Sequence, residues 1–129
     1  MPNYLLDSCV LIRQLRNYPP TVRLMESLVL DGNLSIATIP RTEIVEGMRD
    51  HEREKTMRLL NSLPAHPLDS AVADLAGEYI RRFRQRGTVL DKPDAIIAAT
   101  AVHHDLLLVT YNASHFPMPE LDRYPVVLA

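Results

Sequence analysis

The chain has 129 residues, a formal net charge of −2 and a hydrophobic share of 47%. This length suits one domain over residues 1–129 and is too short for two. No run approaches the ~18 uninterrupted apolar residues that a membrane helix needs, and the net charge gives no global attraction to nucleic acid. Asp7 breaks the first apolar stretch, which excludes a signal-peptide layout, and the single cysteine, Cys9, excludes an internal disulfide. We therefore expect a cytoplasmic globular protein.

Apolar runs and amphipathic segments alternate along the first half of the chain. The expected elements are a strand over Tyr4–Leu6, helices over Ser8–Arg16 and Thr21–Leu30, a strand over Leu34–Ala37, a helix from Thr38 to Gly47 and an amphipathic helix over His51–Leu63. The first strand is continuously apolar, which is typical of a strand buried on both faces. We expect it to be a central strand of the sheet.

The same alternation continues in the second half. The expected elements are a short strand over Ala65–Leu68, helices from Ala71 to Arg84 and from Asp94 to His104, a strand over Leu106–Thr110 and a last strand over Val126–Leu128. Asp69 and Asp91 are the expected caps of the two helices. Strands that alternate with helices predict an α/β fold with a mainly parallel sheet of four or five strands.

Three acids lie at the ends of these apolar elements. Asp7 follows the first strand, Glu43 follows the segment Leu34 to Ile39, and Asp94 heads an apolar helix. Each has an ordinary structural explanation: Asp7 as a helix cap, Asp94 as an acid favoured in a first helical turn, and Glu43 as a solvent-facing residue. However, all strand-to-helix junctions of a parallel sheet open on the same edge. Together the three acids therefore indicate one acidic pocket.

Converging carboxylates repel one another and require a counter-charge. Mg²⁺ or Mn²⁺ is the natural partner, because hard cations choose oxygen ligands. Such an ion lowers the pKa of a bound water and stabilises charge on a phosphoryl oxygen. The sequence contains no GxGxxG or GxxxxGK[ST] motif and no nucleophile elbow. The residues therefore favour metal-assisted phosphodiester hydrolysis.

Four segments resemble the PIN domain and, within it, the VapC-like toxins of VapBC-type toxin–antitoxin pairs. They are Leu5–Ile12, Thr42–Gly47, Asp94–Ala101 and the stretch from Leu108 through Asn112 to Phe116, in the order that the family has. The resemblance implies a three-layer α/β/α fold, a Mg²⁺- or Mn²⁺-dependent ribonuclease and inhibition by a small VapB-like antitoxin. It also places Asp7, Glu43 and Asp94 on the three main acidic positions of the family.

The fourth acidic position of the family falls on Asn112. An asparagine offers a carbonyl oxygen to a metal ion or its water, but no charge. Asp91, one turn upstream of Asp94, is an alternative source of a carboxylate, and its other role is that of a helix cap. Ser8 is expected either to hydrogen-bond a metal-bound water or to cap its helix, and the sequence favours the two roles equally.

RNA binding would require local positive charge on this slightly acidic chain. The candidates for phosphate contacts are Arg13, Arg16, Arg41, Arg49 and the run Arg81 to Arg86, and Tyr111 is a candidate for base stacking. We also expect a homodimer, and an antitoxin whose basic side chain reaches the acids and competes with the metal. A non-catalytic RNA- or protein-binding module of the same fold is an alternative, suggested by Asn112, and a small phosphatase is another.

Overall fold

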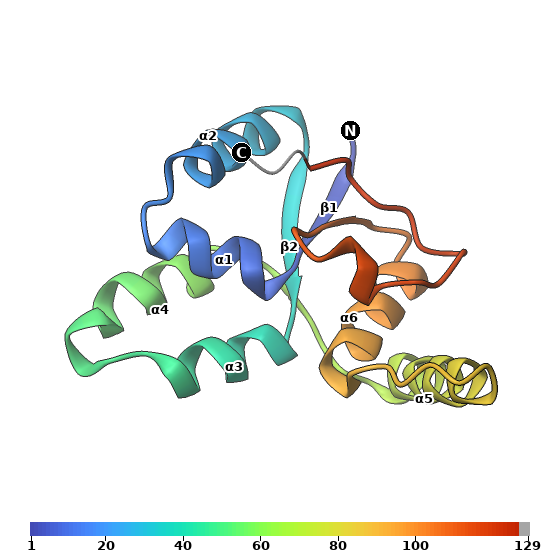
Figure 1. The fold of residues 1–129 in the computed structure, drawn as a ribbon. Coiled ribbons are helices and arrows are strands. Elements are labelled where there is room, and N and C mark those ends of the chain that lie inside the picture. Colours follow the sequence, from blue (N-terminus) through green and yellow to red (C-terminus); the bar gives the residue numbers. More distant parts are fainter. Residues whose placement is uncertain (127–129) are drawn as a thin grey trace.

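A parallel sheet forms the centre of the molecule (Figure 1). The computed structural model of the chain describes residues 1–126. Its four strands lie in the order β3-β2-β1-β4 and pair in parallel throughout. They are β1 (Asn3–Leu6), β2 (Asn33–Ala37), β3 (Ala65–His66) and β4 (Leu107–Val109). β1 lies between β2 and β4, so the predicted central position of the first strand is confirmed.

Six α-helices and two short 3₁₀-helices are found within residues 1–126. They are α1 (Ser8–Leu15), α2 (Pro19–Asp31), α3 (Ile39–Gly47), η1 (Asp50–Glu52), α4 (Arg53–Asn61), α5 (Ser70–Gln85), α6 (Lys92–His103) and η2 (Ala113–His115). None of these helices is both long and apolar enough to cross a membrane.

The helices cover both faces of the sheet, which gives the three-layer α/β/α architecture that was predicted. In Figure 1, α1 to α4 lie on one side of the strands, and α5 and α6 lie on the other. Successive residues of a strand point to opposite faces. Leu5 accordingly packs in the core beneath α5 and α6, whereas Leu6 packs in the core beneath α1 and α2. Both side chains are fully buried, so the continuous apolar run reflects a strand covered on both faces.

Local chemistry fixes the ends of α5. The Asp69 carboxylate accepts a hydrogen bond from the Val72 backbone N–H at 3.0 Å, as expected of a helix cap. Gly87 follows the helix with a φ of 81°, a conformation that glycine adopts without steric cost. Asp91 occupies the predicted cap position of α6, but its side chain makes no capping hydrogen bond.

Several predicted elements differ in extent from those observed. The His51–Leu63 helix is divided into η1 and α4 and ends at Asn61. β3 has two residues instead of the predicted four, because Pro67 has no N–H to extend the pairing; it is an edge strand, as expected. Of the predicted strand Val126–Leu128, Val126 is not in a strand and residues 127 and 128 lie outside the described residues.

Candidate functional site

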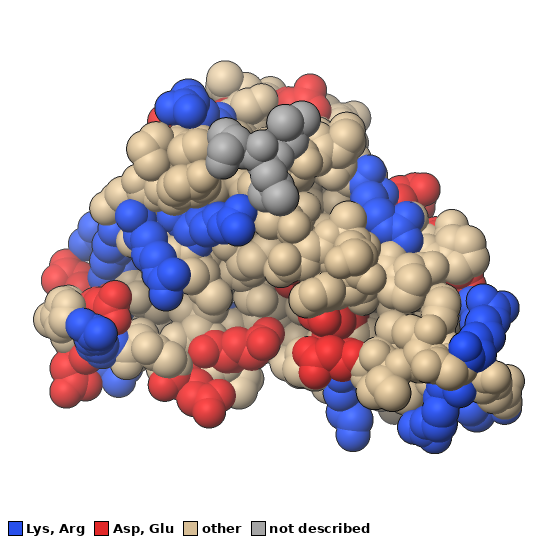
Figure 2. All heavy atoms as spheres, in the orientation of Figure 1, with Lys and Arg blue, Asp and Glu red and all other residues tan. Residues whose placement is uncertain are grey.

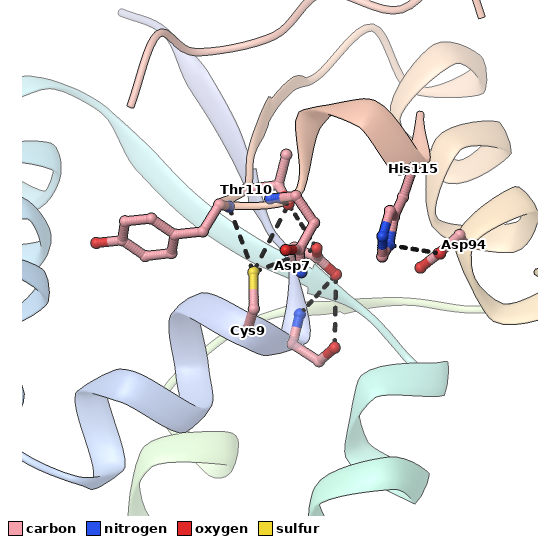
Figure 3. A network of polar contacts seen from close by, with 8 residues as sticks. Asp7, Cys9, Asp94, Thr110 and His115 are labelled. Carbon is pink, nitrogen blue, oxygen red and sulfur yellow. Dashed lines mark hydrogen bonds and ion pairs between the residues drawn. The ribbon is translucent and has the colours of Figure 1, made fainter. Parts of the chain in front are cut away.

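Asp7 lies at the point where β1 passes into α1 (Figure 3). Its side chain is only 3% exposed. Oδ1 accepts a hydrogen bond from the Ser8 backbone N–H at 2.8 Å, and Oδ2 accepts one from Thr110 Oγ1 at 2.7 Å. The Cys9 thiol also donates to Oδ2, at 3.4 Å. Asp7 is therefore both the cap of α1 and a carboxylate whose orientation is fixed from two elements.

Thr110 links Asp7 to the segment that carries Asn112. It follows β4 directly, is buried, and accepts a hydrogen bond from the Asn112 backbone N–H at 2.9 Å while it donates to Asp7. We did not single out this residue from the sequence. The sequence did contain an indication of this role: Thr110 is a hydroxyl residue at the end of an apolar strand, two positions before Asn112. The ends of parallel strands meet at one edge of the sheet, so a hydroxyl there is expected to lie near Asp7.

Asp94 lies in the first turn of α6, as predicted, and its carboxylate is half-buried. Burial and, to a smaller extent, the negative charges of Asp7 and Asp91 together raise the pKa of Asp94 to about 6, although His115 opposes the shift. His115 Nδ1 lies 3.4 Å from Asp94 Oδ2. His115, which reaches the site from η2, was not predicted from the sequence.

Glu43 projects from α3 and is solvent-exposed. Partial desolvation by the surrounding protein nonetheless raises its pKa, and the charges of Asp7, Asp94 and Asp91 add to this effect. The charge of Asp7 thus acts on both Glu43 and Asp94. Figure 2 shows acidic side chains gathered on this face between α3 and α6.

No lysine or arginine of the described residues forms an ion pair with Asp7, Glu43 or Asp94; the one partner found is His115. The site therefore holds negative charge that the protein around it leaves largely uncompensated. Within residues 1–126, no three His, Cys, Asp or Glu side chains are grouped tightly enough to hold an ion as they stand. The donor chemistry nevertheless fits a hard divalent cation, because the donors are carboxylate oxygens and such ions retain several water ligands.

The two candidates for the fourth acidic position both lie near this group. The backbone of Asn112 bonds to Thr110, and the side-chain amide of Asn112 makes no hydrogen bond within the part of the chain that is described. Asp91 is exposed, and its charge raises the pKa of both Glu43 and Asp94. The placement of these residues keeps both alternatives open.

The arginines proposed for phosphate contacts have different surroundings. Arg41 donates to the Leu60 carbonyl oxygen and to the Asn61 side chain, while Arg81 and Arg82 form ion pairs with Glu78 and Glu120. Arg16 and Arg49 line a cleft of about 430 Å³ that Glu43 also lines. Arg13 lies over the Tyr111 ring. Of these arginines, Arg16 and Arg49 therefore share a cleft with one of the acids.

The fold and the site together define a class of protein: a three-layer α/β/α scaffold with a group of acidic side chains where its central strand ends. A family model described as "PIN domain" matches residues 4–119, and the chain belongs to this family. It is 40% identical to "Ribonuclease VapC10" of Mycobacterium tuberculosis over 94% of this chain and 91% of that protein. It is 29% identical to "Ribonuclease VapC19" of the same organism, over 91% of this chain and 95% of that protein.

The fold is also that of solved toxin–antitoxin proteins. The crystal structure of VapBC2 from Rickettsia felis, bound to a DNA fragment from its promoter, contains a chain that superposes with a TM-score of 0.83. The sequence identity is 21%, and the match covers 95% of this chain and 97% of that one. The resemblance to the VapC-like branch of the family, first indicated by the four sequence segments, is confirmed.

Proposed function

We propose that the chain is a cytoplasmic, Mg²⁺- or Mn²⁺-dependent endoribonuclease that acts as the toxin of a type II toxin–antitoxin pair. The observation that carries the proposal is the electrostatic coupling of the acids. The Asp7 charge raises the pKa of both Glu43 and Asp94, and no lysine or arginine of residues 1–126 is paired with any of the three. A divalent cation supplies the missing charge. The names of the two mycobacterial relatives support RNA as the substrate.

In this proposal Asp7, Glu43 and Asp94 would hold the metal ion, and either Asn112 or Asp91 would supply a fourth oxygen. When bound, the ion would lower the pKa of a water and stabilise charge on the phosphoryl group. The protein's own contribution begins with Asp7, whose two oxygens are fixed by the Ser8 backbone and by Thr110. Glu43 is exposed, so its carboxylate is free to position the attacking water together with Asp94.

Asp7→Asn tests the assignment while the local structure is kept. An asparagine retains an oxygen for the Ser8 N–H, and its amide donates to Thr110 Oγ1 in place of the existing bond. We expect metal-dependent cleavage of single-stranded RNA to fall by roughly 100-fold or more, because transition-state charge loses its stabilisation. The melting temperature should not fall, since repulsion between the acids is relieved.

Asp74→Asn, which changes an exposed acid on α5, is the matched control and should cleave normally. EDTA should abolish cleavage by the parent protein. An Asp7→Asn protein with full activity would contradict the assignment.

A non-catalytic binding module is the second candidate, and the uncharged Asn112 is the observation that favours it. The two proposals differ for the parent protein and for Asn112→Asp. A nuclease should cleave RNA, and the added carboxylate should tighten its affinity for the metal. A binding module should bind RNA or a protein partner without cleavage at any metal concentration. Turnover of phosphomonoesters without RNA cleavage would instead indicate a phosphatase.

We further propose a VapB-like antitoxin and a homodimer. Solved structures with this fold include a "toxin-antitoxin complex from Klebsiella pneumoniae", with a TM-score of 0.77. In our proposal a basic side chain of the antitoxin pairs with the uncompensated acids and excludes the metal. Light scattering tests the dimer, and a protein that stays monomeric across the accessible concentration range would contradict it.

A further inference from the structure

The Arg13 guanidinium lies over a ring that the surrounding structure holds in place. Arg13 Cζ is 3.9 Å from the centroid of Tyr111. The Tyr111 hydroxyl is hydrogen-bonded to Thr21 Oγ1 at 2.8 Å, and Thr21 is fully buried. At its other end, the Tyr111 backbone N–H donates to Cys9 Sγ at 3.4 Å. The ring is therefore a fixed platform, and it restricts where the guanidinium lies.

The same contacts tie this cation to the acidic site. Tyr111 follows Thr110, which donates to Asp7 Oδ2 at 2.7 Å. α1 provides a second connection, because Asp7 is its cap and Arg13 lies in its last turn. The rise from residue 7 to residue 13 along a helix is about 9 Å. A positive charge is thus held at a set distance from the centre of the acids.

The Arg13 charge is not neutralised by a carboxylate. Arg13 forms no ion pair within residues 1–126, whereas Arg81 and Arg82 pair with Glu78 and Glu120. Arg13 is also half-buried, so solvent screens its charge less than that of a fully exposed arginine. Stacking on a ring occupies the face of a guanidinium and leaves its in-plane N–H donors available. Those donors form the planar fork that recognises phosphate.

We propose that Arg13, stacked on Tyr111, binds a phosphate of the RNA strand next to the phosphate that is cleaved. That the ligand is an RNA strand rests on the proposed function, whereas the position of Arg13 over Tyr111 does not depend on it. A chain of net charge −2 with an acidic centre repels a polyanion, so a fixed local cation is needed to hold the strand across the site. Figure 2 shows basic side chains over α1 on the same face as the acids.

The salt dependence of RNA binding tests this role. Each phosphate contact to a single strand contributes about 0.7 to the slope of log affinity against log salt. A short, fluorescently labelled single-stranded RNA of mixed sequence serves as the probe, with fluorescence anisotropy measured over a series of KCl concentrations. The parent is the full chain with Glu43→Gln, which prevents cleavage; Glu43 makes no hydrogen bond within residues 1–126, so the Asp7 contacts are kept.

Arg13→Gln in this parent should weaken binding roughly ten-fold and reduce the slope by about 0.7. Arg13→Lys should keep the slope and still bind more weakly, because it retains the charge and loses the fork. Arg58→Gln is the matched control: it removes one positive charge from α4, where Arg58 is already paired with Glu54, and it should leave the slope unchanged.

An unchanged slope in Arg13→Gln would overturn the proposal, and a lower melting temperature with an unchanged slope would assign Arg13 to the stability of α1 instead. The ribonuclease proposal is tested separately, by cleavage with the unmodified chain and metal. Absence of cleavage together with an Arg13-dependent slope would overturn the ribonuclease proposal and support the phosphate site. Cleavage together with an Arg13-independent slope would support the ribonuclease proposal and overturn the phosphate site. RNA that does not bind the parent at all overturns the phosphate site.

Discussion

Asp7 combines a structural role and a proposed catalytic role in one carboxylate. Oδ1 caps α1 through the Ser8 N–H, and Oδ2 is held by the Thr110 hydroxyl. The same residue raises the pKa of Glu43 and Asp94 through its charge. The neighbours of Asp7 are therefore the residues that hold its carboxylate in one orientation.

Thr110→Val tests this orienting role. Loss of the hydroxyl leaves Asp7 Oδ2 without its 2.7 Å donor and the Asn112 N–H without its acceptor. We expect a loss of stability of about 1–3 kcal/mol, because buried polar groups are left unsatisfied. Cleavage should fall by roughly 10–100-fold, the usual effect of removing a partner of a metal ligand.

Thr110→Ser keeps the hydroxyl and should retain most of the activity. Denaturant unfolding and initial cleavage rates at saturating metal measure the two effects. Full activity in Thr110→Val would show that Asp7 does not need this contact.

Asp94 makes the stability of the metal-free protein dependent on pH. Its pKa is raised from 3.8 to about 6 in the folded protein, so the unfolded chain ionises first as the pH rises. The fold therefore loses stability through this group between about pH 4 and pH 6, and the loss is complete above that range. The melting temperature of the unmodified protein should therefore fall relative to that of Asp94→Asn as the pH rises over this interval.

The two proteins should melt alike near pH 3, where Asp94 is protonated in both the folded and the unfolded state. Mg²⁺ or Mn²⁺ should raise the melting temperature of the unmodified protein above pH 6 and have little effect at pH 4, because protons compete with the metal. A melting difference that does not depend on pH would contradict this account of Asp94.

At the scale of helices and strands, the sequence predicted the order of the elements well and their ends less well. The continuous apolar run of β1 and the aspartate that follows it were sufficient to place Asp7 at a strand end. The short length of β3 depends on the pairing of the chain around Pro67, which the apolar pattern does not describe. Thr110 and His115 were missed because their roles arise from contacts with Asp7 and Asp94, residues distant in sequence.

The two predicted helix caps should differ in their effect on stability. Asp69→Ala removes a capping hydrogen bond to Val72 and should cost about 1 kcal/mol, with normal cleavage. Asp91→Ala removes no side-chain capping bond and relieves the repulsion on Asp94, so it should not destabilise the protein. Urea unfolding compares the two variants. An equal loss of stability in both would contradict the observed difference in capping.

The metal dependence of cleavage in Asp91→Ala also decides between the candidates for the fourth acidic position. If Asp91 supplies a carboxylate ligand, the metal concentration required for half-maximal cleavage should rise markedly. If Asn112 fills that position, the required concentration should rise only slightly, because Asp91 then contributes a nearby negative charge but no direct ligand.

For the whole molecule, the main question is which apolar surface the fold leaves uncovered. The segments Ser8–Arg16, Thr21–Leu30 and His51–Leu63 carry many apolar residues, but Leu11, Leu28 and Leu60 are buried in the core. The exposed apolar residues of α2 are instead Val29 and Leu30, at 60% and 86% exposure. The sequence could not separate the two sets, because every face of α2 carries apolar residues and only the packing determines which face is inward. The prediction of one domain over residues 1–129 stays a prediction.

Val29 and Leu30 border a cavity of about 810 Å³ that is also lined by Leu59 of α4 and by Leu63, which follows that helix. We expect this cavity to hold an apolar segment of the antitoxin, because an exposed apolar patch is a typical protein interface.

Leu30→Asp should weaken binding of the cognate antitoxin by roughly ten-fold or more, since a charge would be buried without a partner. RNA cleavage should be unchanged, because Leu30 lies outside the group of acids. Leu68→Asp, a change at another exposed leucine (46% exposed), is the control and should bind normally. Co-purification with the antitoxin and calorimetric titration measure the effect. Tight binding by Leu30→Asp would show that the antitoxin docks elsewhere.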